Sequence, residues 1–189
     1  MLKNPLLFIY KTVKTNIISH FMNALQLPYH FDVNEILKEI NLFTQQDYYD
    51  IYNSSVEVET LWSKHLTEPI GGPEQLPQFL PNEALQKSPY LLSILETFQC
   101  IKETFRIHTL DAKAHIRPHR DIGYSLEQGM IRLHIPVETN ENIQLIVNNE
   151  EIKMKAGECW YCNFNEIHEV KNNSDLPRTH LIMDCVVND

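Results

Sequence analysis

MIRLHIPV, residues 130–137, alternates apolar and polar side chains as a half-buried β-strand does. Ile131, Leu133, Ile135 and Val137 share one face, and Arg132 and His134 share the other. Seven similar segments surround it, separated by turn residues: FRIHTL (105–110), KAHIRP (113–118), NIQLIVN (142–148), EIKMKA (151–156), ECWYCN (158–163), IHEVKN (167–172) and THLIMDCVV (179–187). Eight strands within about 85 residues predict a β-sandwich or jelly roll.

The residues before this region have a different pattern. Apolar side chains recur near a period of 3.6 through residues 5–25, which predicts an amphipathic helix packed on the core. Asp32 followed by Glu35 has the pattern of a helix start, and Ser88-Pro89 predicts another helix that continues to about Lys102. The stretch 67–82, rich in Pro and Gly, is expected to be a loop.

These patterns predict one mainly β domain with N-terminal helices. The chain has 189 residues, which suits a single domain. We expect residues 1–103 to form a mostly helical buttress with substrate-side loops, and residues 104–189 to form the β core. In MIRLHIPV the apolar face should then pack on the helices, and the Arg132/His134 face should line the mouth of a barrel.

Composition narrows the classes of partner and the compartment. The formal net charge is −9 and no Lys/Arg run reverses it locally, so nucleic acid is disfavoured as a partner. Four cysteines are too few for a disulfide scaffold. The apolar run at the N-terminus is too short to span a membrane. We therefore expect a cytoplasmic protein without a membrane partner; its oligomeric state stays open.

Three side chains have the types and positions of an iron centre. His119 and Asp121 are two residues apart at the end of the strand KAHIRP, so both point to one side. His168 lies at the start of the strand IHEVKN. Two histidines and one carboxylate on one face of iron(II) leave three positions open for co-substrate and O₂. The alternative for these residues is a solvated turn or a satisfied buried polar cluster.

An arginine near this candidate centre fits a co-substrate. In such a centre 2-oxoglutarate would occupy two of the open positions, and its distal carboxylate would need a fork-shaped cation. Arg178 opens the last strand, ten residues after His168, and is our candidate anchor; the alternative is a surface ion pair. Arg132 and His134 could bind a co-substrate carboxylate or the substrate. His180, on the face of Arg178, could support the site.

The pair Cys159 and Cys162 resembles a redox or zinc motif on paper. Three residues apart on a strand, however, the two thiols point to opposite faces, and no helix follows them. We expect buried free cysteines.

The motifs RIHTLDAKAHIRPHRD, IRLHIPV, GECWYCNFNEIHEVKN and RTHLIMDCVV resemble the aspartyl/asparaginyl β-hydroxylase family of 2-oxoglutarate dioxygenases, which includes bacterial proline hydroxylases. The resemblance covers about residues 105–187, and it is weaker in FDVNEILKEI and WSKHLTEPIGGP. It implies a double-stranded β-helix of the cupin jelly-roll type. It also implies that His119, Asp121 and His168 bind iron, that Arg178 binds the 2-oxoglutarate C5 carboxylate, and that Arg132 and His134 contact the co-substrate. The Asp184 that follows Arg178 fits the same pattern.

The function that these expectations describe is an Fe(II)- and 2-oxoglutarate-dependent dioxygenase. It would use O₂ to hydroxylate an aliphatic C–H of an amino acid, a peptide side chain or a related small metabolite. The retained Asp121 favours hydroxylation over halogenation. One rival is a metal-holding cupin-fold binding or regulatory protein without turnover, and another is a zinc or manganese isomerase or hydrolase on the same fold. The motifs are specific to the family and much less so to one substrate.

Overall fold

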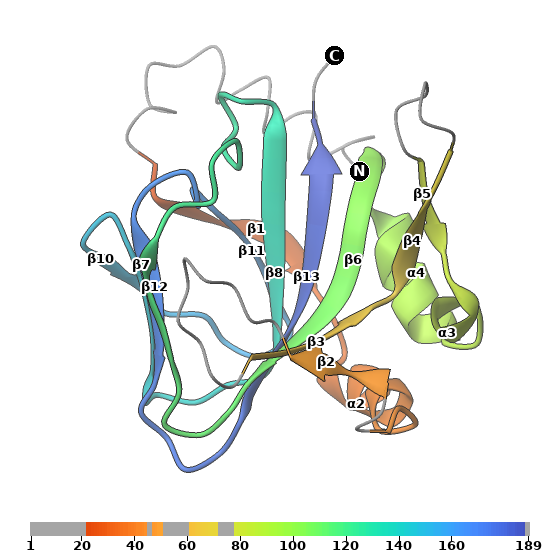
Figure 1. Ribbon diagram of the computed structural model, residues 1–189, viewed down its shortest axis with the longest axis horizontal. Coiled ribbons are helices and arrows are strands. Elements are labelled where there is room, and N and C mark those ends of the chain that lie inside the picture. The colour runs from red at the N-terminus through yellow and green to blue at the C-terminus, as the bar shows by residue number, and fades with distance from the viewer. Residues whose placement is uncertain (1–21, 45–46, 51–60, 72–77, 188–189) are drawn as a thin grey trace.

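Two antiparallel sheets face one another and enclose a space that we call the barrel interior (Figure 1). The computed structural model describes residues 22–44, 47–50, 61–71 and 78–187. The seven-stranded sheet has the order β1 (Ala24–His30), β11 (Glu158–Cys162), β8 (Met130–Glu138), β13 (Arg178–Val186), β6 (Ile101–Leu110), β3 (Leu61–His65) and β2 (Tyr49–Asp50). The four-stranded sheet has the order β10 (Glu150–Ile152), β9 (Ile143–Val147), β12 (His168–Asn172) and β7 (His115–His119).

The two faces of the seven-stranded sheet bury different cores. One core lies between this sheet and the helices, and Leu133, Ile135 and Leu181 belong to it. The other lies in the barrel interior and includes Leu145 and Val170 of the four-stranded sheet. Alternation along β8 and β13 therefore separates the apolar helix-facing side chains from the polar ones that face the barrel interior. The predicted orientation of MIRLHIPV is confirmed.

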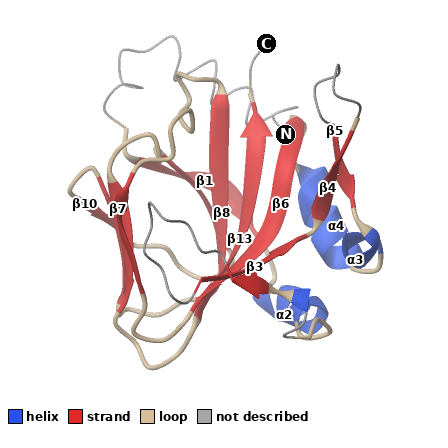
Figure 2. Ribbon diagram, viewed as in Figure 1, coloured by secondary structure: helices blue, strands red, loops and turns tan. Residues whose placement is uncertain are grey.

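Within the described part of the chain, three helices cover the outer face of the seven-stranded sheet (Figure 2). They are α2 (Val33–Ile40), α3 (Glu83–Gln86) and α4 (Pro89–Thr97). Asp32 caps α2 by accepting hydrogen bonds from the backbone N–H groups of Asn34 and Glu35, as its pattern predicts. Ser88 precedes α4 without a side-chain cap, and the helix ends at Thr97 rather than near residue 102.

The eight strands predicted after residue 104 are all present, which confirms a mainly β jelly roll with helices on one face. Asn148 and Asn149 join β9 to β10 with φ angles of +48° and +65°. Two consecutive residues with positive φ are the signature of a tight hairpin turn, and asparagine tolerates that conformation better than most residues.

The N-terminal half differs from its prediction in containing several strands. Ala24 and Leu25, assigned to the end of the helix 5–25, lie in β1, whereas residues 5–21 are outside the described residues. The stretch 67–82 contains a two-stranded sheet of β4 (Thr67–Ile70) and β5 (Gln78–Pro81) where a loop was expected; residues 72–77 are not described. The described part of residues 1–103 is thus not mostly helical. No helix among the described residues is long and apolar enough to cross a membrane.

Candidate active site

The three candidate iron ligands meet at one end of the barrel interior, which we call the metal end. His119 closes β7, Asp121 follows it, and His168 opens β12, directly opposite His119 in the strand register. One ligand atom from each lies within 4.8 Å of the others, and His119 Nε2 is 3.6 Å from Asp121 Oδ1. Among the described residues, this cluster is the only group of three or more His, Cys, Asp and Glu side chains that could hold a metal ion.

Hydrogen bonds orient both histidine rings for metal binding. His119 Nδ1 lies 2.8 Å from the Arg117 carbonyl oxygen, and His168 Nδ1 lies 3.0 Å from that of Glu166. A carbonyl oxygen only accepts, so each Nδ1 carries a proton, and Nε2 is the ring nitrogen left to bind a metal. Burial lowers the pKa of His168 to about 4, which keeps its ring neutral near pH 7. Two neutral imidazole nitrogens and one carboxylate oxygen suit iron(II).

Phe164 ties the two ligand segments together, although they are more than 40 residues apart in sequence. Its carbonyl oxygen accepts a hydrogen bond of 2.9 Å from the Asp121 backbone N–H. Its ring lies 4.6 Å from the His168 ring and 4.8 Å from the His134 ring, centroid to centroid. Sequence reasoning missed this residue, because an aromatic side chain in a turn carries no signal of the two contacts it makes.

A buried ion-pair network supports Asp121. Arg132 pairs with the Asp121 carboxylate and, through Nε at 2.7 Å, with Asp184. Asp184 also pairs with Arg106, at 2.7 Å. Burial alone would raise the pKa of Asp184, but Arg132 and Arg106 more than offset it and hold the pKa well below its usual range. Burial likewise opposes the charge on Arg132, but Asp184 and Asp121 outweigh it and raise its pKa. Arg132 and Asp184 therefore stay ionised at neutral pH.

The candidate anchor Arg178 has no such compensation. It lies at the opposite end of the barrel interior, which we call the base, and its residue is only 2% exposed. Among the described residues no carboxylate lies within ion-pair distance of it, and its Nε has no hydrogen-bond partner. Burial lowers the pKa of Arg178 to about 9. An uncompensated buried guanidinium is costly, so this position is suited to an anionic ligand.

Two histidines complete the polar surface between the base and the metal end. The Arg178 Nη2 donates to His180 Nδ1 over 2.8 Å, so the proton of His180 is on Nε2. His134 Nδ1 is 3.2 Å from the same His180 atom. The Nε2 atoms of both rings are buried without a partner among the described residues. Burial holds the pKa of both well below the ordinary value, so both are neutral. Arg178 and His180 thus present two unpaired donors.

The structure separates the residues that the sequence grouped as co-substrate contacts. His134 and Arg178 face the barrel interior with unpaired polar atoms, whereas the Arg132 guanidinium is already bound to Asp121 and Asp184. Cys159 lies in the helix-side core and Cys162 in the barrel-side core, which confirms that their thiols diverge. All four cysteines are free.

Two facing sheets that carry a His-Asp-His cluster suited to a divalent metal describe a jelly-roll protein with a candidate metal centre. The family model for Aspartyl/Asparaginyl beta-hydroxylase matches residues 31–187. The chain therefore belongs to the aspartyl/asparaginyl β-hydroxylase family, and its fold is the double-stranded β-helix expected from the resemblance.

Similar proteins agree with this placement. The L-proline cis-4-hydroxylase of Rhizobium meliloti (strain 1021) is 33% identical over 103 residues, which cover 53% of this chain. The match spans only 36% of that relative's length. A 2OG-Fe(II) oxygenase family oxidoreductase from Burkholderia pseudomallei has the same fold, with a TM-score of 0.63, 13% identity and coverage of 96% of this chain and 90% of that one. A Trichoplax adhaerens prolyl hydroxylase, solved with a hypoxia inducible factor peptide fragment, has a TM-score of 0.59 and 11% identity, with coverage of 96% and 90%.

Proposed function

We propose that this protein is an Fe(II)- and 2-oxoglutarate-dependent dioxygenase that hydroxylates an aliphatic C–H and releases succinate and CO₂. The observation that carries the proposal is the meeting of His119, Asp121 and His168 in a barrel that also buries an unpaired arginine. One half of this arrangement suits a divalent metal and the other half suits a carboxylate.

The proposed roles follow the geometry. His119 and His168 would bind iron through Nε2, and Asp121 through a carboxylate oxygen. Bound iron(II) and 2-oxoglutarate supply the activation of O₂ and the oxidation of the C–H bond. Arg178 would bind the C5 carboxylate of 2-oxoglutarate, with His134 and His180 beside its carbon chain. Arg132 would act through Asp121, because it holds that carboxylate in place.

The substrate class is a small molecule or a peptide side chain. The match to a proline hydroxylase favours a free amino acid or a similar small metabolite, although it covers only part of that relative. We further propose that residues 1–189 form one domain that acts in the cytoplasm, where reducing conditions suit iron(II). The net charge of −9 disfavours nucleic acid as a partner.

Uncoupled turnover distinguishes this enzyme from a metal-holding cupin-fold binding protein and from a zinc or manganese isomerase or hydrolase. Wild-type protein with iron(II), ascorbate and 2-oxoglutarate should release succinate, and candidate amino acids and peptides should gain one oxygen by mass. We expect His119→Ala and Asp121→Ala to lower succinate release by at least ~1000-fold, about 4 kcal/mol. His115→Ala is the matched control, because His115 lies on the same strand but bonds to Glu169 at 2.8 Å. Wild-type turnover in either ligand variant would disprove the assignment.

A further inference from the structure

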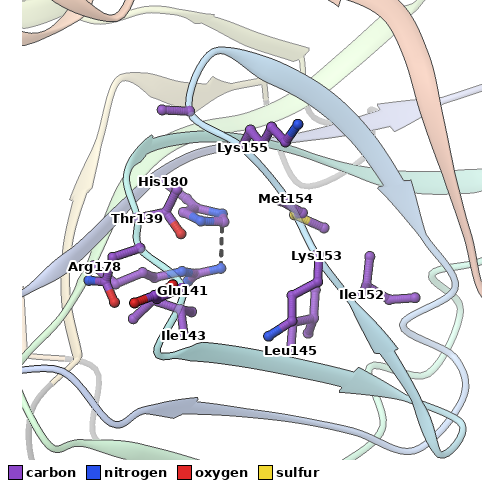
Figure 3. A pocket seen from close by; sticks show the side chains of 12 residues that line it. Thr139, Glu141, Ile143, Leu145, Ile152, Lys153, Met154, Lys155, Arg178 and His180 are labelled. Atoms are coloured by element: carbon purple, nitrogen blue, oxygen red, sulfur yellow. Dashed lines mark hydrogen bonds between the residues drawn. The ribbon is translucent and has the colours of Figure 1, made fainter.

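A cavity of about 370 Å³ opens from the base of the barrel interior. Arg178 and His180 form its polar side, and Ile143, Leu145 and Ile152 form an apolar wall (Figure 3). The figure shows the Arg178 guanidinium and the His180 ring pointing toward the same space, with the hydrogen bond between them drawn. The cavity is therefore one in which a carboxylate can meet a cation while an alkyl chain lies on apolar side chains.

Strand register places this cavity relative to the candidate iron ligands. On β9, Val147 is opposite His168, Leu145 is opposite Val170, and Ile143 is opposite Asn172. Leu145 therefore lies two residues along the strand from the level of His168, and Ile143 lies four residues from it. Four residues of a strand span about 14 Å. It then reaches the turn at Thr139 and the segment at Lys155. Free space at the base is therefore not confined to the immediate surroundings of Arg178.

The volume exceeds what the tail of 2-oxoglutarate needs. Its C5 carboxylate and the two methylenes next to it are five non-hydrogen atoms, whereas about 370 Å³ holds on the order of ten waters at roughly 30 Å³ each. Cavities of this size commonly accept much larger ligands. We propose that the protein binds 2-oxo dicarboxylates longer than 2-oxoglutarate, beginning with 2-oxoadipate. This proposal rests on the proposed function, because it takes the same site as the co-substrate pocket.

The chemistry of the walls supports a longer acid. An added methylene moves the distal carboxylate toward the base, where the Arg178 and His180 side chains line the cavity. The added carbon lies against Ile143, whose burial in the barrel-side core provides an apolar contact. Glu141, Lys153 and Lys155 also line the cavity, so its rim carries charges of both signs.

Calorimetric titration of the Mn(II)-loaded protein tests this without turnover and without a known substrate. The ligands are 2-oxoglutarate and 2-oxoadipate. We expect the Kd for 2-oxoadipate to lie within tenfold of that for 2-oxoglutarate; a larger ratio would overturn the inference and leave the proposed function standing. Failure of both acids to bind would overturn the proposed function and this inference together.

A pair of identical substitutions on β9 locates the effect. Ile143→Phe should fill the cavity and raise the Kd for 2-oxoadipate at least tenfold, with a change below threefold for 2-oxoglutarate. Ile146→Phe places the same ring on the outer face of the strand, since residues 143 and 146 point to opposite faces, and should change neither Kd. Thermal melting verifies that both variants fold. Equal losses for both acids in Ile143→Phe, or a selective loss in Ile146→Phe, would overturn the inference.

Discussion

Both ends of the barrel interior contain buried arginines, but in the described part of the chain only those at the metal end have carboxylate partners. At the metal end, Arg132 and Arg106 are paired with Asp184, and Arg132 also reaches Asp121. At the base, Arg178 is more deeply buried than either of them but has no carboxylate partner among the described residues. A buried cation with built-in partners is part of the scaffold, whereas a buried cation without them is suited to an anionic ligand. Burial and residue type alone do not distinguish the two.

The largest expected effect is at the metal end, in Asp184→Asn. The amide keeps the shape of the side chain but leaves two buried guanidinium groups without their shared carboxylate. We expect the free energy of unfolding to fall by about 3–5 kcal/mol, measured by urea denaturation. Asp175→Asn is the control, because Asp175 pairs with Lys113 at the surface with its side chain 90% exposed, and it should leave stability unchanged. Equal stability of the two variants would contradict the distinction between scaffold and surface pairs.

The second largest expected effect is a loss of folding stability in acid, caused by buried histidines at the base and in the middle of the barrel interior. Burial holds the pKa of His108, His134 and His180 well below 6.5, so the unfolded chain binds protons below pH 6.5 that the folded chain refuses. Their contribution to stability is present above pH 6.5 and is lost as the pH falls. Each should cost about 1.4 kcal/mol between pH 7.5 and 5.5, or about 4 kcal/mol for the three.

Denaturation of wild type at the two pH values checks this expectation. His108→Gln removes one of these groups, so its pH-dependent loss should be smaller by about 1.4 kcal/mol. An identical loss in the variant would show that His108 is protonated in the folded protein. Asp184 does not contribute in this window, because its depressed pKa matters only where an unfolded aspartate begins to bind protons.

At the base, Arg178→Met should affect binding and stability in opposite directions. Affinity for 2-oxoglutarate should fall roughly 100-fold, about 2.7 kcal/mol, because the charge-assisted contact is lost. The ligand-free protein should be as stable as wild type or more so, because a buried, unpaired charge has been replaced by an apolar chain of similar length. Calorimetry and denaturation measure the two effects. Unchanged affinity would place the anchor elsewhere.

The smallest expected effect is at Tyr124, whose ring lies 4.1 Å from the Arg132 guanidinium carbon. Tyr124→Leu removes this cation–π contact and should lower the free energy of unfolding by about 1 kcal/mol. Tyr124→Phe keeps the aromatic face, so it should retain most of that energy. Loss of the same size in both variants would assign the effect to the hydroxyl group.

The strands of the C-terminal half were predictable because one face of each carries mostly polar side chains and the other carries apolar ones. Strict alternation, as in residues 130–137, results from polar side chains inside the barrel and apolar ones under the helices. β1 was not recognised because Leu25 fits both a helical and a strand period, and because Pro28 argues against a strand. Pro28 is tolerated since β1 lies at the edge of the sheet, where the register shifts beside it.

The candidate ligands could be predicted from strand phase, but the ion-pair network that holds Asp121 in place could not. His119 and Asp121 are neighbours in sequence, and His168 lies at a strand start, so direction and position were enough. The choice of Asp184 as the partner of both Arg132 and Arg106 depends on which strands are adjacent. Strand order in a jelly roll is not sequential, so pairings across β6, β13 and β8 have no local signature.

The central position of β13 has a consequence for protein synthesis. β13 lies between β6 and β8 and pairs with both along most of their lengths. Until residues 178–186 leave the ribosome, β6 and β8 each present an open strand edge to the cell. At ordinary elongation rates the interval from the end of β8 to the end of β13 is about 2–10 seconds. During that time the edges of β6 and β8 that pair with β13 stay open to aggregation. Slower translation over residues 139–177 would lengthen the time for which these edges are exposed.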